Sequence, residues 1–260
     1  MNQHLKKIEM RINQYQLTKR TRYIPYMSRH VFAIPYIKFL SHAVIPLNQQ
    51  WHYETETGII HSFTDKNEMS DLHYVRSFII EDFDDSKDYH LNIEEVQQSF
   101  MIYLNQSDVG AVEGNEGHIE FDITHAVHGE MNVIELVPIK TMMSPQQNLF
   151  NDMYVLERAN DRIVDYSVDV SQNARGDMSV RIQIQDIEGP LISYLLQNEQ
   201  HVTFAKGVMD IDSSYHLVIP VHLVEQQGKH FTLFLETEDE TIAHYIGSNG
   251  EHEPVNVKTV

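Results

Sequence analysis

The chain has 260 residues, of which 42% are hydrophobic and 22% charged, and it contains no cysteine. Such a length exceeds one compact β-sandwich of about 100 to 150 residues, so two domains are expected. The formal charge of −19 repels phosphate backbones and anionic lipids, and the missing thiols exclude disulfides and thiolate catalysis. Neither nucleic acid nor a membrane is therefore an expected partner.

The first 22 residues are basic, unlike the acidic remainder of the chain. Leu5, Ile8, Ile12 and Tyr15 recur at three- and four-residue steps, which predicts an apolar stripe on a short helix. We interpret residues 1–45 as an N-terminal extension whose helix packs on the acidic body, and a membrane-surface helix is the alternative. Because no apolar run is long enough for a membrane span or a secretory signal, a cytoplasmic location is expected.

Alternation of apolar and polar residues with a period of two dominates the rest of the chain and predicts short strands. Two of these strands flank a polar turn and predict a β-hairpin. Many short strands without intervening helices favour sandwiches over a doubly wound sheet or an α/β barrel. The expected strands are 89–93, 100–104, 164–170, 179–184, 215–221 and 231–235.

Residues 140–151, which include Pro145 and several amide side chains, are the least strand-like stretch between the alternating blocks. We place the boundary between two domains there. The expected division is 1–45 as the extension, 46–155 as the first domain, 156–250 as the second domain and 251–260 as a C-terminal tail.

Five short segments between Leu47 and Arg158 carry side chains that alternation alone does not require. In this order and spacing they resemble the N-terminal sugar-binding, jelly-roll domain of glycoside hydrolase family 2, of the β-galactosidase-like kind, and the junction into its immunoglobulin-like domain. The fold implied is all-β, a jelly-roll β-sandwich (galactose-binding-domain-like) followed by an immunoglobulin-like β-sandwich. The segments are 47–53 with Trp51, 74–78, 100–110 with Asn105 and Gly110, 120–134 with Phe121, Asp122, Thr124, Gly129 and Asn132, and 149–158.

These residues are expected to be architectural. Asp122 and Thr124 can bond local backbone where a strand turns, Gly129 would permit a positive φ, and Trp51 would be an apolar anchor. The family carries glycines where this chain has Gln49 and Gln106.

By the resemblance, the whole enzyme hydrolyses terminal β-galactosides with retention. The family would enter its catalytic barrel after Gly247, whereas 13 residues follow here, so the barrel is expected to be absent and the chain to be a non-catalytic N-terminal region. Met69 and Met142-Met143 stand where the family's sugar- and sodium-binding residues would lie. Methionine cannot supply their oxygen ligands, so no catalytic residue, substrate-binding residue, metal ligand or cofactor is predicted.

Several patterns imitate functional sites but are expected to be structural. Three Asn-Glu pairs mimic the family's acid/base motif outside its barrel context. The pair of His125 and His128 lacks the third donor that a metal site needs. An Arg-Gly-Asp tripeptide occupies the predicted hairpin turn, where glycine and aspartate are common. The Asn-Glu pairs are Asn67-Glu68, Asn115-Glu116 and Asn198-Glu199, and the tripeptide is Arg175-Gly176-Asp177.

Two other functions stay open at this point. A stand-alone carbohydrate-binding module would expose aromatic side chains and bind sugar without a partner. A structural subunit that complements a separate barrel would expose a large apolar patch on the first domain. Self-association could cover such a patch, so a homodimer is a further hypothesis.

Overall fold

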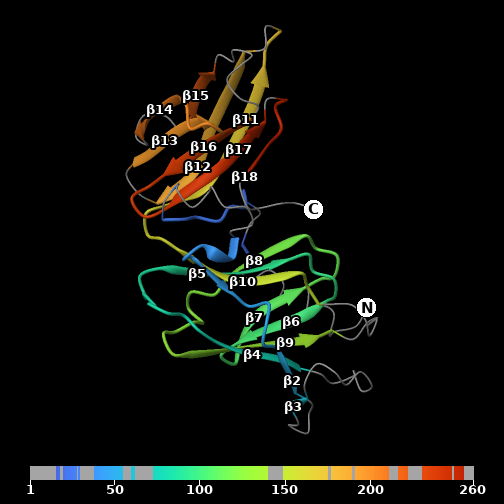
Figure 1. Cartoon of the computed structure of the whole chain (residues 1–260). Coiled ribbons are helices and arrows are strands. Elements are labelled where there is room, and N and C mark those ends of the chain that lie inside the picture. Colours follow the sequence, from blue (N-terminus) through green and yellow to red (C-terminus); the bar gives the residue numbers. More distant parts are fainter. Residues whose placement is uncertain are drawn as a thin grey trace. The chain divides into compact units, whose positions relative to one another are not determined.

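In the computed structural model the chain forms two compact units (Figure 1). Unit 1 comprises Met1–Thr18 and Ile45–Arg158, and unit 2 comprises Lys19–Val44 and Ala159–Val260. Regular structure in the described residues is strand, apart from short 3₁₀ turns such as η2 at Lys38–Leu40. The structure describes residues 16–17, 20–27, 29, 38–54, 60–61, 73–139, 149–174, 177–188, 191–210, 216–221, 230–247 and 249–254.

Unit 1 is a sandwich of two antiparallel sheets. One sheet has the strand order β1-β10-β5-β8 and the other β3-β2-β4-β9-β6-β7. The strands are β1 (Val44–Pro46), β2 (His52–Glu54), β3 (Ile60–His61), β4 (His73–Ile79), β5 (Asp88–Glu94), β6 (Phe100–Leu104), β7 (Ser107–Val112), β8 (His118–Asp122), β9 (Met131–Pro138) and β10 (Asp152–Arg158).

The core of unit 1 comes from the alternating residues of both sheets. Leu91 and Ile93 of β5 face Ile102 of β6 and Leu136 of β9 in one cluster, and all four are fully buried. Since successive side chains of a strand point to opposite faces, the period-two pattern places these residues inward. The predicted strands in this unit are confirmed.

Strand β10 lies in unit 1 along its whole length, pairing antiparallel with β5 from Asp152 to Arg158. The sequence interpretation ended the first domain at residue 155, inside this strand. Met153 and Val155 of β10 contribute to the unit 1 core, so the boundary falls after the strand rather than within it.

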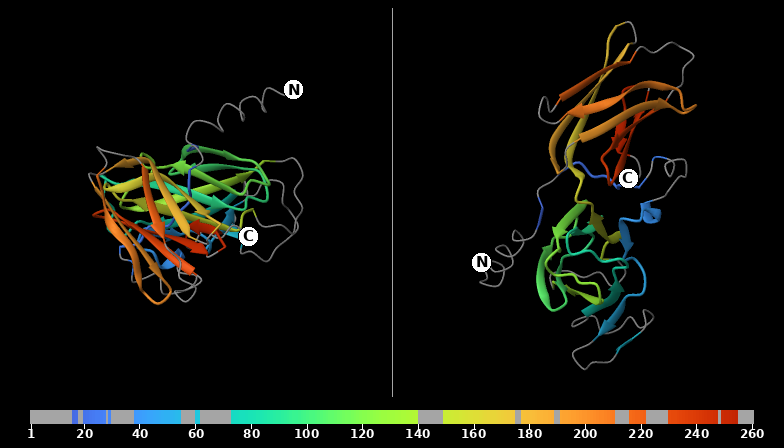
Figure 2. Two further views of the ribbon diagram at one scale, coloured as in Figure 1. Left: turned by 90° about the horizontal axis from the view of Figure 1, so that it is seen from above. Right: turned by 90° about the vertical axis from the view of Figure 1, so that its left-hand side faces the viewer.

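Unit 2 is a second antiparallel sandwich, whose strands Figure 2 shows from two further directions. Its sheets have the orders β11-β12-β15 and β14-β13-β16-β17-β18. In immunoglobulin-like folds the first, second and fifth strands share one sheet and the third, sixth and seventh the other, as here, while the fourth strand, β14, pairs with the third, β13. The strands are β11 (Arg162–Gln172), β12 (Met178–Glu188), β13 (Leu191–Asn198), β14 (Thr203–Asp210), β15 (His216–Val221), β16 (His230–Glu236), β17 (Thr241–Gly247) and β18 (His252–Pro254).

The predicted hairpin is confirmed, because β11 and β12 pair antiparallel from Arg162↔Glu188 to Gln172↔Met178. Its turn is closed by Asn173, whose Oδ1 accepts from the Asp177 amide at 3.0 Å and whose Nδ2 donates to the Asp177 carboxylate at 2.9 Å. Arg175 and Gly176 lie outside the described residues.

Residues 20–26 are an integral part of unit 2 rather than part of a separate extension. The Thr21 hydroxyl donates to the Tyr166 carbonyl at 2.5 Å, and Tyr26 forms a β-bridge with Thr241. Tyr23 lies between these points and is buried in the unit 2 core against the ring of Tyr166. The segment spans from β11 to β17, a long-range pairing that the basic character of the N-terminus does not reveal.

The structure bears on the sequence interpretation at one of the two chain ends. The helix expected near residues 5–15 lies outside the described residues. The expected C-terminal tail begins with ordered structure, because β18 pairs with β17 through His252, Glu253 and Pro254. No helix in the described part of the chain is long and apolar enough to cross a membrane.

Candidate functional site

Asn105 and Asn132 form the centre of a buried polar network in unit 1. Asn132 is fully buried, and its Oδ1 accepts from the Asn105 Nδ2 at 2.8 Å and from the His128 amide at 3.1 Å. Its Nδ2 donates to the carbonyls of His128 at 2.8 Å and Glu130 at 3.1 Å. Asn105 in turn accepts from the Val133 amide at 2.8 Å. The two asparagines therefore fasten the β6–β7 turn to the connection before β9.

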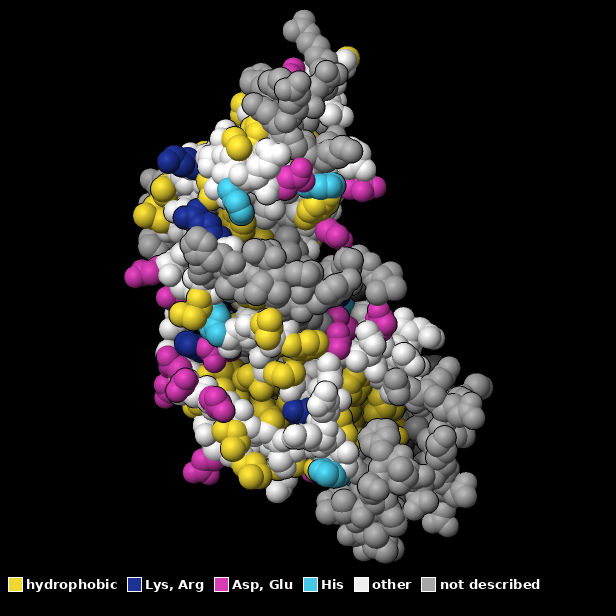
Figure 3. All heavy atoms as spheres, viewed as in Figure 1, with side chains coloured by type: hydrophobic (Ala, Val, Ile, Leu, Met, Phe, Trp, Pro, Cys, Tyr) yellow, Lys and Arg dark blue, Asp and Glu magenta, His cyan; other side chains and the backbone are white. Residues whose placement is uncertain are grey.

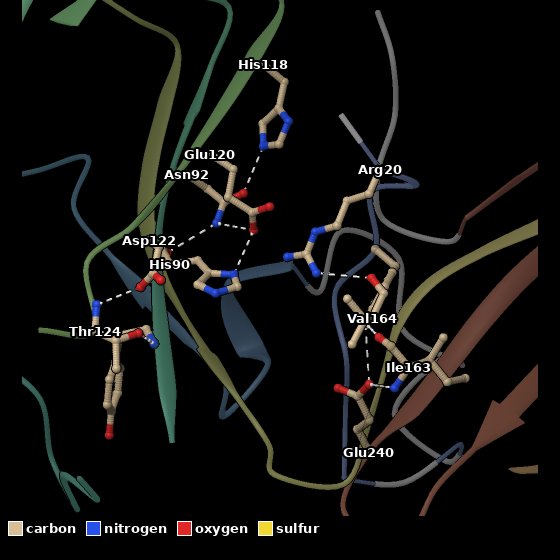
Figure 4. Close-up of polar contacts among 12 residues, drawn as sticks. Arg20, His90, Asn92, His118, Glu120, Asp122, Thr124, Ile163, Val164 and Glu240 are labelled. Atoms are coloured by element: carbon tan, nitrogen blue, oxygen red, sulfur yellow. Dashed lines mark hydrogen bonds and ion pairs between the residues drawn. The ribbon is translucent and has the colours of Figure 1, made fainter. Parts of the chain in front are cut away.

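Asp122 bonds local backbone, as expected from the sequence, whereas Thr124 bonds the backbone of the distant strand β5. The Asp122 carboxylate accepts from the Thr124 amide at 3.0 Å, and the Thr124 hydroxyl accepts from the Tyr89 amide at 3.0 Å (Figure 4). The first contact satisfies a backbone donor just after β8, which is the structural role that short polar side chains have at turns, and the second satisfies a backbone donor at the start of β5.

Two glycines lie where the side chain of a phenylalanine comes close to the glycine backbone. A Cβ on Gly110 would lie 2.8 Å from the Phe121 ring, and φ at Gly110 is 155°. A Cβ on Gly129 would lie 3.2 Å from the Cβ of Phe83. The expectation of a positive φ at Gly129 is wrong, because the positive-φ glycines in the described residues are Gly110 and Gly250. The side chain of Phe83, not the backbone angle, limits this position.

Trp51 is an apolar anchor, as expected. Its indole Nε1 donates to the Leu47 carbonyl at 2.7 Å, and its ring meets Phe150 edge-on with centroids 6.0 Å apart. The ring packs against the unit 1 core while remaining partly exposed. Its position thus links the segment before β2 to the segment before β10.

One of the two positions where the resembled family carries glycine, Gln106, has a left-handed backbone. Asn105 and Gln106 have φ of 50° and 68° in the two-residue turn between β6 and β7, a geometry for which Asn-Gly is preferred. Near Trp51 the positive φ belongs to Gln50, at 66°, rather than to Gln49. Asn105 and Gln106 therefore carry side chains at backbone angles that glycine accepts with less strain.

A buried polar layer covers the outer face of the β10-β5-β8 strands, and the sequence analysis did not find it. The His90 Nδ1 lies 3.2 Å from the Glu120 carboxylate, and both side chains are 8% exposed (Figure 4). Asn92 donates to the same carboxylate at 3.4 Å, and His118 contacts the Asn92 Oδ1 at 2.8 Å. Outward positions of a sandwich strand are normally solvated, so alternation alone predicts exposure here.

This layer is completed within unit 1 by two further contacts. The Tyr154 hydroxyl donates to the Glu94 carboxylate at 3.0 Å. Leu17 donates its amide to the Glu120 carbonyl at 3.0 Å, beside a β-bridge between Gln16 and Phe121. No group of three or more histidine or acidic side chains among the described residues is placed to hold a metal ion. The layer is therefore a hydrogen-bonded structural network of paired groups.

Two of the Asn-Glu pairs lie in turns of the sandwiches. Asn115 has φ of 73° between β7 and β8, and the Glu116 carbonyl accepts from Val96 at 2.8 Å. The Asn198 Oδ1 accepts from the amides of Gln200 at 3.0 Å and Val202 at 2.8 Å. These contacts account for both asparagines structurally.

Other positions singled out in the sequence are exposed or lie outside the structure. His125 and His128 are both exposed. Asn67-Glu68, Met69 and Met142-Met143 lie outside the described residues, so the sugar-loop interpretation stays a prediction.

Unit 2 contains a second polar network, centred on His244. The Tyr166 hydroxyl lies 3.2 Å from the His244 Nδ1, and the His244 Nε2 lies 3.2 Å from the His252 Nδ1. Burial lowers the pKa of His244 to about 3, with a smaller contribution from His252, and burial also raises the pKa of Tyr166. Nearby, Glu240 accepts from the Ile163 amide at 3.0 Å (Figure 4).

The fold and these networks define an all-β protein of two sandwiches whose motif residues hold turns and strand ends. No protein-family model matches the chain. It is 28% identical over 191 residues to the β-galactosidase of Staphylococcus xylosus, an alignment that covers 67% of this chain and 19% of that protein. The chain thus spans about a fifth of the length of that curated relative.

Solved structures with the same fold include several β-glucuronidases. The enzyme of Dictyoglomus thermophilum has a TM-score of 0.57 at 17% identity, covering 78% of this chain and 43% of its own. The Lactobacillus rhamnosus enzyme has a TM-score of 0.59 at 14% identity, covering 78% and 44%. The chain is therefore similar in sequence to part of a β-galactosidase and shares its fold with part of these β-glucuronidases.

Proposed function

We propose that this chain is the sandwich scaffold of a protein that hydrolyses terminal β-galactosides, and that the chain itself has no hydrolytic activity. The observation that carries the proposal is the position of the motif residues. Asn105, Asp122, Thr124 and Asn132 each use their side chains on backbone or on one another. Side chains committed in this way stabilise the sandwich and are not available to a substrate.

The chemistry of retaining hydrolysis supports the same proposal. That reaction needs an acid/base and a nucleophilic carboxylate about 5 to 5.5 Å apart on opposite sides of the glycosidic bond. Asn115 and Asn198, which precede the candidate glutamates, shape turns. We further propose that unit 1 is of the sugar-binding jelly-roll type, which its two-sheet antiparallel topology supports.

A role in assembly is a second candidate, favoured by the outer face of β4 and β9. Ile79 and Met131 are directly opposed across these strands and are 55% and 60% exposed. Val133 and Val137 follow on the same face of β9, each partly exposed, with the charged side chain of Glu135 between them. Figure 3 shows hydrophobic side chains on the visible surface of unit 1. An apolar face of this kind favours contact with another protein domain.

The test is hydrolysis of chromogenic β-galactosides and β-glucuronides by the purified chain, with its mass verified. We expect no turnover above buffer, and we expect the Glu116→Gln and Glu199→Gln variants to behave as the wild type. Turnover that follows the chain through purification and is lost in either variant would overturn the proposal, because it would place a catalytic carboxylate in these sandwiches.

A further inference from the structure

Ile79 and Met131 form an exposed apolar spot at one end of unit 1. Ile79 is the last residue of β4 and Met131 the first of β9, and the two are directly opposed, with 55% and 60% of their surface exposed. The chain leaves β4 through residues 80–87 and enters β9 through residues 123–130. We call the surface formed by the two side chains and these two connections the β4–β9 end.

Acidic side chains surround the apolar spot. The connection after β4 contains the run Glu-Asp-Phe-Asp-Asp, and Glu130 directly precedes Met131. Lys87 is the lysine of the same connection, and it is paired with Glu157 at 2.6 Å. The β4–β9 end therefore presents an apolar centre with a negative rim that the neighbouring lysine does not neutralise. The exposed carboxylates of this rim, which form no ion pair with a described residue, are Glu81, Asp82, Asp85 and Glu130.

The N-terminal segment leaves unit 1 in the direction of this surface. Gln16 forms an antiparallel β-bridge with Phe121 of β8. Because the pairing is antiparallel, the chain before Gln16 continues past Asp122, the last residue of β8. The connection from β8 to β9 starts at the same point. Residues 1–15 therefore begin beside one of the two connections that border the apolar spot.

The segment is long enough to reach Met131. Strands β7 and β8 are neighbours, since a Cβ on Gly110 of β7 would lie 2.8 Å from the ring of Phe121 on β8. The direct path from there to β9 combines a sheet spacing of about 10 Å with two strand spacings of about 5 Å, which gives about 14 Å. Residues 5–15 span about 16 Å as a helix and about 36 Å as an extended chain.

The sequence of residues 1–15 is complementary to this surface. Its apolar residues recur at three- and four-residue steps and match the apolar centre, while its three cations against one acid match the negative rim. Complementary charge directs a segment to one surface rather than to another of similar hydrophobicity. The apolar residues are Leu5, Ile8, Ile12 and Tyr15, the cations are Lys6, Lys7 and Arg11, and the acid is Glu9.

We propose that residues 1–15 dock on the β4–β9 end of their own chain, with the apolar stripe on Ile79 and Met131 and the cations against the acidic rim. The inference rests on the assembly role proposed above, because it takes the same face as an interaction surface and names its occupant. A segment that covers this face in its own chain competes with any partner for it. Docking would therefore control whether the face is open to assembly.

Paramagnetic relaxation enhancement, measured by NMR on the full chain, tests the docking. The sequence has no cysteine, so the variant His128→Cys carries a single spin label. His128 is exposed and contacts Asn132 through its backbone amide and carbonyl, so the label leaves those contacts in place. We expect the amide signals of residues 5–12 to be lost and to return when the label is reduced. The matched label on Gln97→Cys, exposed beyond the other end of β5, should leave these signals unchanged.

Two further samples make the outcomes distinct. Signal loss in a mixture of labelled chains with unlabelled, isotope-enriched chains would overturn docking within one chain and assign the face to a second copy. Combining Lys6→Glu, Lys7→Glu and Arg11→Glu changes only the segment and should restore the signals. Unchanged signals with the His128→Cys label, or signal loss that survives the charge reversal, would also overturn the docking. Dimers of the wild type that are absent in Ile79→Lys would support the assembly role even then, and the hydrolysis assay is independent of both.

Discussion

The buried asparagine network makes a strong prediction about the stability of unit 1. Replacing Asn132 with alanine removes four side-chain hydrogen bonds, to Asn105, to the amide and carbonyl of His128, and to the carbonyl of Glu130. Each is worth about 1 kcal/mol, and the site is fully buried, so water does not replace all of the lost partners. We expect Asn132→Ala to lower the free energy of unfolding of unit 1 by about 3 to 4 kcal/mol.

The single tryptophan makes this measurement specific to unit 1. Trp51 is the one tryptophan of the sequence and packs against the unit 1 core, so its fluorescence during urea unfolding follows that unit. The matched control is Glu130→Ala in the same connection, because the Glu130 side chain is exposed and only its carbonyl takes part. The control should shift stability by no more than about 0.5 kcal/mol.

A double-mutant cycle with Asn105→Ala measures the coupling free energy between Asn105 and Asn132. Since Asn105 and Asn132 contact each other, the double variant should lose less than the sum of the two single losses. The reasoning would be refuted by a loss below about 1 kcal/mol for Asn132→Ala, or by additive effects in the cycle.

Two further predictions concern the turn and the apolar face of unit 1. Gln106→Gly should raise the unfolding free energy by about 1 kcal/mol, because φ is 68° there and glycine accepts that angle without strain. The control is Gln97→Gly, at an exposed position whose φ is not positive. A loss of stability in Gln106→Gly would contradict the turn assignment. For self-association through the face bearing Ile79 and Met131, analytical ultracentrifugation should show dimers of the wild type and monomers of Ile79→Lys. The control Val208→Lys, on the surface of unit 2, should remain dimeric. Identical sedimentation of all three proteins would exclude this role.

Much of the fold could be predicted from local patterns. The alternation at 164–170 and 179–184 predicted a hairpin, and β11 and β12 pair as expected. The Asp122 contact could also be predicted, since its carboxylate bonds the amide two residues further along the same turn. These contacts and patterns involve residues close together in the sequence, so they can be predicted without the tertiary structure.

Other features depend on contacts between distant segments. Tyr23 packs on Tyr166 across the chain, which makes residues 20–26 part of unit 2, and no local signal distinguishes that from a free extension. The restriction at Gly129 comes from Phe83, a residue of another connection.

By itself the sequence determined which side chains of each strand face inward, because a period of two is a property of the extended backbone. Only the tertiary structure decided which outward faces are also buried. His90 and Glu120 occupy outward positions and are nonetheless enclosed, while Ile79 and Met131 occupy outward positions and are exposed. The reason is that an outer face is buried only where another segment of the chain covers it. That segment is distant in the sequence, so no local pattern identifies it.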